Sequence, residues 1–288
     1  MRESESRFFT VRRLRYHVRH WPRPGARKMV LLHGWMDVSA SFQFMVDELQ
    51  GEWDVYAPDW RGYGLTDWGR EDSYWFPDYL ADLDFLLQEI SPGKPVSLVG
   101  HSLGGNVACL YAGVQPGRVE KLVNLEGFGM SATVPAQAPQ RYARWLEELR
   151  DPPGLKPYAD FQELASRLRK TNPRLSIEKS SFLAQHWGRE EGGKVLLRSD
   201  PAHKIVNATL YRYEEAQACW REVTAPVLWV DAALSDTHKR IGLDAAQLAE
   251  RRAAFRSLRF VTVPDAGHML HHDQPQAVAR LIEAFLLA

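Results

Sequence analysis

The residues with the clearest chemical meaning are a serine, a histidine and several carboxylates that follow separate strand-like segments. Gly100, Ser102 and Gly104 fit the G-x-S-x-G pattern within "VSLVGHSLGGNVA", where a short apolar run passes into a helix-like segment. In this context the pattern predicts a tight turn that lifts a serine hydroxyl above a sheet. The two glycines fit because such a turn leaves little room for side chains beside the serine. Ser102 is therefore the candidate nucleophile.

A serine hydroxyl attacks well only when a base removes its proton. Among the ten histidines, His268 follows the last predicted strand, in "VTVPDAGHMLHHDQP". We expect its loop to lie at the same edge of the sheet as the serine, where sites form in α/β proteins. His271 and His272 are expected to pack or to lie exposed, since one base suffices. His33 and His101 are expected to shape the site by hydrogen bonding.

Attack on a carbonyl also requires backbone N–H groups that bind the developing oxyanion. One predicted strand ends at "LLHGWMD", which places the Trp35 N–H where it can point toward the serine. The Leu103 N–H is the first after the nucleophile and is the natural second donor. We therefore predict an oxyanion hole formed by Trp35 and Leu103.

Five segments together resemble the capped group of the α/β-hydrolase superfamily, which includes esterases, haloalkane dehalogenases, epoxide hydrolases and carbon–carbon hydrolases. They are "LLHGW", "YAPDWRGYGLTD", "VGHSLGGNVA", "PVLWV" and "VPDAGHMLHHDQP", and they span most of the predicted core. Dehalogenases and epoxide hydrolases of this fold carry an aspartate as the nucleophile of the tight turn. The resemblance, with Ser102 at that position, implies acyl transfer to water.

The acid that completes the triad is where the chain departs from the family pattern. In the family it commonly follows the strand of "PVLWV" after a glycine, but here Asp231 occupies the glycine position and Asp236 comes five residues later. We predict that Asp236 is the partner of His268 and that Asp231 orders the loop. Glu126, in "LVNLEGFGM", is the alternative, because some dehalogenases carry their acid there. Both Asp236 and Glu126 keep the chain order serine, acid, histidine.

The surrounding pattern alternates between strands and helices, which predicts a mostly parallel central sheet with helices on both faces, the α/β-hydrolase fold. The predicted strands are 28–34, 53–59, 95–100, 119–127, 225–231 and 258–264, and the predicted helices are 76–90, 104–114, 246–255 and 275–287. Residues 128–222 look like helices broken by prolines and glycines. We expect a helical cap there, inserted into a core of residues 1–127 and 223–288.

The aromatic residues of this predicted cap leave two interpretations open. Trp145, Trp187 and Trp220 either line an apolar acyl pocket or pack the cap against the core. The aromatic content of the cap leads us to expect a small to medium apolar acyl compound as the small-molecule substrate.

Composition excludes several other classes of protein. Lysine plus arginine equals aspartate plus glutamate at 36 each, so no net field favours nucleic acid. No apolar run is long enough for a membrane span. The two cysteines lack metal-ligand spacing, so we expect neither a disulfide framework nor a zinc site. The low cysteine content leads us to expect a cytoplasmic location. No metal or organic cofactor is implied, and the sequence does not address the oligomeric state.

The sequence therefore predicts a serine hydrolase of carboxylesterase type. It would cleave an ester or related acyl bond through Ser102, His268 and Asp236 and form an acyl-enzyme. A carbon–carbon hydrolase or thioesterase with the same triad is an alternative. A third is a non-catalytic ligand-binding protein on the same fold.

Overall fold

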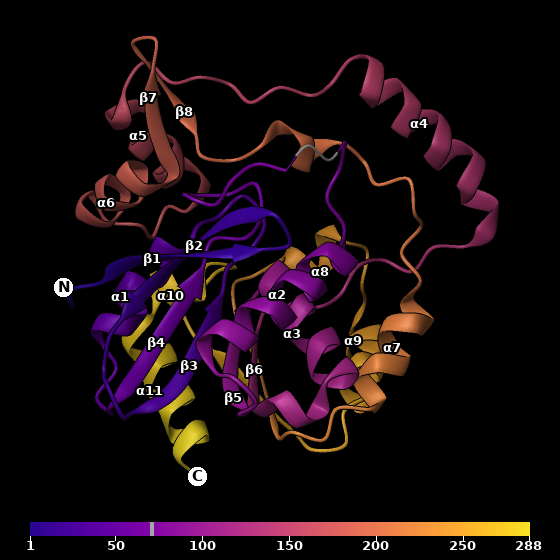
Figure 1. Ribbon diagram of the computed structural model, residues 1–288. Coiled ribbons are helices and arrows are strands. Elements are labelled where there is room, and N and C mark those ends of the chain that lie inside the picture. Colours follow the sequence, from indigo (N-terminus) through magenta and orange to yellow (C-terminus); the bar gives the residue numbers. More distant parts are fainter. Residues whose placement is uncertain (70–71) are drawn as a thin grey trace.

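The computed structural model describes residues 1–69 and 72–288 and is built around a twisted sheet of eight strands (Figure 1). The order is β1-β2-β4-β3-β5-β6-β9-β10. Strands β1, β2 and β4 pair antiparallel, and the pairs from β4 to β10 are parallel. The strands are β1 (Glu5–Val11), β2 (Leu14–Trp21), β3 (Arg27–Leu32), β4 (Trp53–Pro58), β5 (Val96–His101), β6 (Val119–Leu125), β9 (Val227–Ala232) and β10 (Leu258–Val263).

The central strands are buried on both faces because helices cover the sheet from both sides. One apolar core lies against α2 (Phe76–Ile90), α3 (Leu103–Val114), α7 (Tyr213–Arg221) and α9 (Ala245–Ala253). The opposite core lies against α1 (Gln43–Asp47), α10 (Leu270–Asp273) and α11 (Pro275–Leu287). Short 3-10 turns are η1 (Ser39–Phe42) and η2 (Pro116–Arg118), and α8 (Thr237–Arg240) follows β9. The predicted α/β-hydrolase fold class is thus confirmed.

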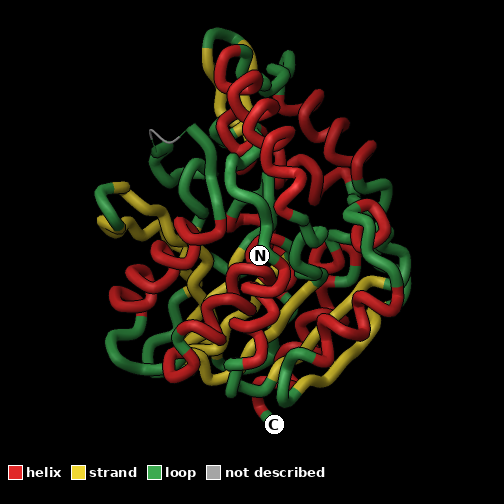
Figure 2. The backbone as a smooth tube through the Cα atoms, turned by 90° about the vertical axis from the view of Figure 1, so that its right-hand side faces the viewer, coloured by secondary structure: helices red, strands yellow, loops and turns green. Residues whose placement is uncertain are grey.

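Between β6 and β9 the chain forms an insertion, residues 126–226, most of which lies above the sheet in Figure 1. Figure 2, in a view turned by 90°, shows helices on both sides of the strands. Besides α7, its elements are η3 (Pro135–Gln137), α4 (Ala138–Arg150), α5 (Phe161–Thr171), α6 (Ile177–Trp187), β7 (Gly188–Glu191), β8 (Lys194–Leu197) and η4 (Pro201–Lys204). In Figure 1, α4 lies on one side of this insertion and α5, α6 and the β7–β8 hairpin lie on the other.

The expectation of helices alone in this insertion missed the hairpin. The strands β7 and β8 pair antiparallel around Gly192 and Gly193, whose φ angles are 58° and 70°. A two-residue hairpin turn with positive φ at both positions favours a Gly-Gly pair. The "EEGGK" segment carries this signal, but the helical segments on either side of it dominate the pattern.

Buried aromatic rings provide two of the contacts that join the insertion to the core. The ring of His203 stacks between Tyr63 and Tyr74, with centroids 3.8 Å from each. Helix α7 packs along α3, and its Trp220 is fully buried in the core. The range predicted for the cap, 128–222, thus includes one helix that belongs to the layer of helices over the sheet. Within residues 1–69 and 72–288, no helix combines the length and apolar character needed to cross a bilayer.

Candidate active site

Ser102 lies at a sharp turn between β5 and α3, with φ 52° and ψ −113°. This backbone conformation is strained for a residue with a side chain and is held by packing on both sides. A Cβ atom at Gly100 would lie 2.3 Å from the carbonyl oxygen of Gly104, and one at Gly104 would lie 2.0 Å from that of Leu32. Glycine at both positions therefore allows the turn, as the sequence predicted.

His268 lies in the loop after β10 and connects Ser102 to a carboxylate. Its Nε2 atom is 3.0 Å from Ser102 Oγ, and its Nδ1 atom is 3.1 Å from Glu126 Oε2. An ionised carboxylate only accepts, so Nδ1 carries the proton and Nε2 is free to accept from the serine hydroxyl. This is the tautomer that a base acting on Ser102 requires.

Glu126, which is 2% exposed, follows the last residue of β6 with a φ of 57°. Its Oε1 accepts from the Ala232 N–H at 2.7 Å, and its Oε2 accepts from the Ser235 hydroxyl and from His268. These donors satisfy a carboxylate that would be costly to bury alone. They also fix its direction toward the histidine.

Asp236, the predicted partner of His268, does not reach it, and that prediction is wrong. The Asp236 side chain is 68% exposed and pairs with Arg240 at 3.0 Å. The loop after β9 turns back at Ser235, whose N–H donates to the Ala232 carbonyl, so Asp236 becomes the residue before α8. The longer loop thus delivers Ser235 to the site and leaves Asp236 in solvent.

Comparison with known proteins shows the family of this fold and site. The sequence model for the alpha/beta hydrolase fold matches residues 28–275 of the chain. The chain belongs to the α/β hydrolase family. A serine hydrolase-like protein of Danio rerio is 27% identical over 278 residues, which cover 92% of this hydrolase and 83% of that protein. The 2-(acetamidomethylene)succinate hydrolase of Mesorhizobium japonicum is 26% identical, over 90% of this chain and 87% of its own.

A solved structure supports the fold of this hydrolase at low sequence identity. The thioesterase domain from the curacin biosynthetic pathway superposes with a TM-score of 0.88 and 24% identity, covering 98% of this chain and 99% of its own. This likeness concerns the fold. The family match and the serine hydrolase-like relatives confirm the predicted hydrolytic function.

Asp231 anchors the strand that carries it in this hydrolase. Its carboxylate accepts from Trp229 Nε1 at 2.8 Å and pairs with Arg252 on α9. Burial raises the pKa of Asp231, Arg252 opposes that effect, and the nearby Glu126 adds to it. Its contacts join β9 to α9, so it stabilises the surroundings of the loop that bears Ser235.

The candidate oxyanion donors lie on two segments beside Ser102. Leu103 is the first residue of α3, where the helix leaves its own N–H groups unpaired, and Trp35 follows β3. His33 accepts from the Trp60 N–H through Nε2 at 2.9 Å, so its Nδ1–H donates to the Gly34 carbonyl at 2.8 Å. This contact fixes the peptide that carries the Trp35 N–H. The expected hydrogen-bonding role of His33 is therefore present in the structure.

A cavity of about 590 Å³ opens on Ser102 and is bounded by Trp35 and Leu103. Much of its aromatic wall comes from the start of α2, in the "YWFPDY" segment, with Tyr74, Trp75, Phe76 and Tyr79. The sequence interpretation overlooked this segment, although its aromatic density was the available signal. The predicted cap tryptophans lie elsewhere: Trp220 is in the core, and Trp187 lines a second cavity of about 600 Å³ on the His268 side.

Proposed function

We propose that this hydrolase cleaves an ester or related acyl bond through Ser102, His268 and Glu126. One observation carries the proposal, namely the chain of hydrogen bonds from Ser102 Oγ, which lines the first cavity, through His268 to Glu126. Nucleophile, base and orienting acid are within hydrogen-bond reach in the order that activates a serine.

In the first half of the reaction, Ser102 Oγ attacks the substrate carbonyl and passes its proton to His268 Nε2. The imidazolium that forms stays paired with the Glu126 carboxylate. The Trp35 and Leu103 N–H groups stabilise the oxyanion. Collapse of the tetrahedral intermediate transfers the proton to the leaving alcohol and leaves an acyl group on Ser102.

In the second half, His268 takes a proton from a water molecule, which attacks the acyl-enzyme. The second tetrahedral intermediate collapses, Ser102 recovers its proton from His268, and the carboxylic acid leaves. Every proton in the cycle passes through His268 Nε2, so no metal or organic cofactor is needed for this chemistry.

The walls of the first cavity support an acyl group of small to medium size as the bound portion of the substrate. Aromatic side chains from α2 and Phe128 provide apolar contact, and Arg141 and Arg144 of α4 form part of the lining. A cavity of about 590 Å³ is within the usual range for small-molecule sites, roughly 300–1,000 Å³. We therefore propose carboxylic esters with an apolar acyl chain as the substrate class.

The test is labelling with a fluorophosphonate, which reacts with an activated serine. Wild-type protein and Ser131→Ala should label, because Ser131 lines the same cavity but its hydroxyl donates to the Ile241 carbonyl rather than to a histidine. Ser102→Ala should not label and should lose hydrolysis of p-nitrophenyl esters. Equal labelling of Ser102→Ala, or no labelling of folded wild type, would show that the proposal is wrong.

A further inference from the structure

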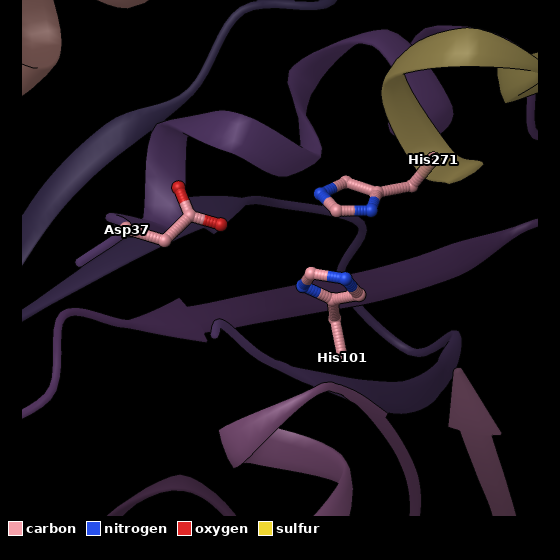
Figure 3. A group of neighbouring side chains, drawn as sticks. All are labelled: Asp37, His101 and His271. Carbon is pink, nitrogen blue, oxygen red and sulfur yellow. The ribbon is translucent and has the colours of Figure 1, made fainter. Parts of the chain in front are cut away.

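Three side chains with metal-ligand chemistry meet behind the nucleophile, and within residues 1–69 and 72–288 their facing atoms have no hydrogen-bond partner. Asp37, His101 and His271 are 2%, 1% and 0% exposed, and one ligand atom from each lies within 4.8 Å of the others. Figure 3 shows the two imidazole rings beside each other and the Asp37 carboxylate directed toward them. The three residues come from the loop after β3, the end of β5 and α10.

With the Asp37 carboxylate ionised, the hydrogen bonds around this cluster leave it with more acceptors than donors. His101 Nε2 is 2.8 Å from the His268 carbonyl, which only accepts, so the proton is on Nε2 and Nδ1 presents a lone pair. Asp37 Oδ1 accepts from the Val38 N–H and from Ser41, whereas Oδ2 has no partner among the described residues.

His271 cannot balance this arrangement alone. Both of its ring nitrogens lack partners in the described part of the chain, and a neutral imidazole offers one N–H and one lone pair. One N–H therefore faces up to three acceptor sites, on His101, Asp37 and His271 itself. Buried polar atoms left unpaired are destabilising, and a cation at the centre would satisfy all three lone pairs at once.

We propose that Asp37, His101 and His271 bind a transition-metal ion of the Zn²⁺ class. Two imidazole nitrogens and one carboxylate oxygen are a donor set that suits such ions. Zinc bonds of about 2.0–2.2 Å require ligand atoms roughly 3.3–3.5 Å apart, so atoms that lie within 4.8 Å of one another must close by at most about 1.5 Å. A water molecule takes the fourth position.

Such an ion would connect the three segments that carry the reacting groups. Asp37 is two residues after Trp35, His101 precedes Ser102, and His271 is three residues after His268. A Cβ atom at Gly34 would lie 3.0 Å from His101 Nδ1 and 3.3 Å from Ser102 Cβ. The cluster therefore lies next to the loop that carries the Trp35 N–H. The ion stabilises the relative positions of these loops and hence the folded state.

The test titrates chelator-treated protein with Zn²⁺ in a calorimeter and with Co²⁺ in a spectrophotometer. Wild type should bind one ion per chain, give the intense visible bands of four-coordinate Co²⁺, and melt at a higher temperature with Zn²⁺. Asp37→Asn and His271→Gln should each weaken Zn²⁺ binding by about 100-fold or more. Removing a residue that only hydrogen-bonds to a metal ligand costs roughly 10–100-fold in affinity, and the loss of a ligand itself should cost at least as much.

The matched control is His20→Gln, which removes a histidine of β2 whose ring contacts Glu5 and Asp54 and is not part of the cluster. It should bind Zn²⁺ as wild type does. Circular dichroism checks that each variant is folded. If a variant is not folded, the titration of wild-type protein tests the proposal. No Zn²⁺ uptake by wild type, six-coordinate Co²⁺ bands, or binding lost only in His20→Gln would overturn the proposal.

Discussion

At the scale of single residues, the site depends on how one buried carboxylate is directed. Glu126 has a positive φ, and Asn124 holds the turn after it by donating to the Gly127 carbonyl and accepting from the Gly127 N–H, at 2.7 and 2.9 Å. Ser235 and the Ala232 N–H then fix the carboxylate oxygens. Because these contacts leave Oε2 facing His268, Glu126 is positioned to stabilise the imidazolium of the proposed mechanism.

Glu126→Gln should therefore reduce kcat by about 1,000- to 10,000-fold with little change in KM, because the neutral amide no longer stabilises the imidazolium or its tautomer. Steady-state hydrolysis of a p-nitrophenyl ester measures this. Asp236→Asn is the matched control, since its side chain lies in solvent beside Arg240. It should keep kcat within about twofold of wild type, and a large loss in Asp236→Asn would contradict the assignment of the acid.

At the scale of elements, the turn that carries Ser102 is possible because β5 and α3 approach each other closely. The N–H of Ser102 donates to the Leu125 carbonyl of β6 at 2.8 Å, so the turn is also connected to the strand that leads to Glu126. The strain at Ser102 is thus maintained by packing of neighbouring elements, and enlarging either glycine beside it would separate them.

Gly104→Ala tests this packing. The added methyl group would overlap the Leu32 carbonyl, so we expect the free energy of unfolding to fall by about 3 kcal/mol or more, despite the better helix propensity of alanine. Gly117→Ala, where nothing lies within 4 Å of the added atom, should change it by less than about 0.5 kcal/mol. Urea unfolding measures both, and equal stabilities would refute the packing argument.

At the scale of the whole molecule, burial keeps several histidines neutral. Burial lowers the pKa of His203 to about 3 and that of His33 to about 4. For His203, the ring lies between Tyr63 and Tyr74, and the charges of His33 and Arg61 add to the lowering of its pKa, whereas the Arg61 backbone opposes it. In the unfolded chain these rings return to a pKa of about 6.5.

The unfolded chain therefore binds more protons than the folded protein below pH 6.5. Stability is fully present above that pH and is lost as the pH falls toward 3 to 4. Each such histidine contributes a slope of up to about 1.4 kcal/mol per pH unit in this window.

His203→Gln removes one of these groups, so its unfolding free energy should depend less steeply on pH between about 6 and 4. The variant should take up about 1 proton fewer on unfolding than wild type, which is a difference in slope of about 1.4 kcal/mol per pH unit. Urea unfolding at several pH values measures the slope, which is independent of any constant loss of stacking. A slope equal to that of wild type would mean that burial does not keep His203 neutral in the folded protein.

Much of the fold could be predicted from contiguous segments. The helix expected over 76–90 is α2, and the strands expected over 53–59 and 258–264 are β4 and β10, within one residue of their observed ends. These elements are encoded by local apolar periodicity. The β7–β8 hairpin was missed because its strands are short and lie among helices, so periodicity gives little signal there.

The sequence by itself determined the six strands of the parallel part of the sheet, the turn at Ser102 and the candidate base His268, because each is encoded by neighbouring residues with a characteristic spacing. The antiparallel strands β1 and β2 were not among the predicted strands. Only the tertiary structure decided between Glu126 and Asp236, since both follow strands that end at the same edge of the sheet. The difference arises from the positive φ at Glu126 and from the turn at Ser235, which sends the next side chain into solvent. Side-chain direction at a strand end depends on such long-range contacts, and so do the aromatic wall of the cavity and the meeting of Asp37 with His101 and His271.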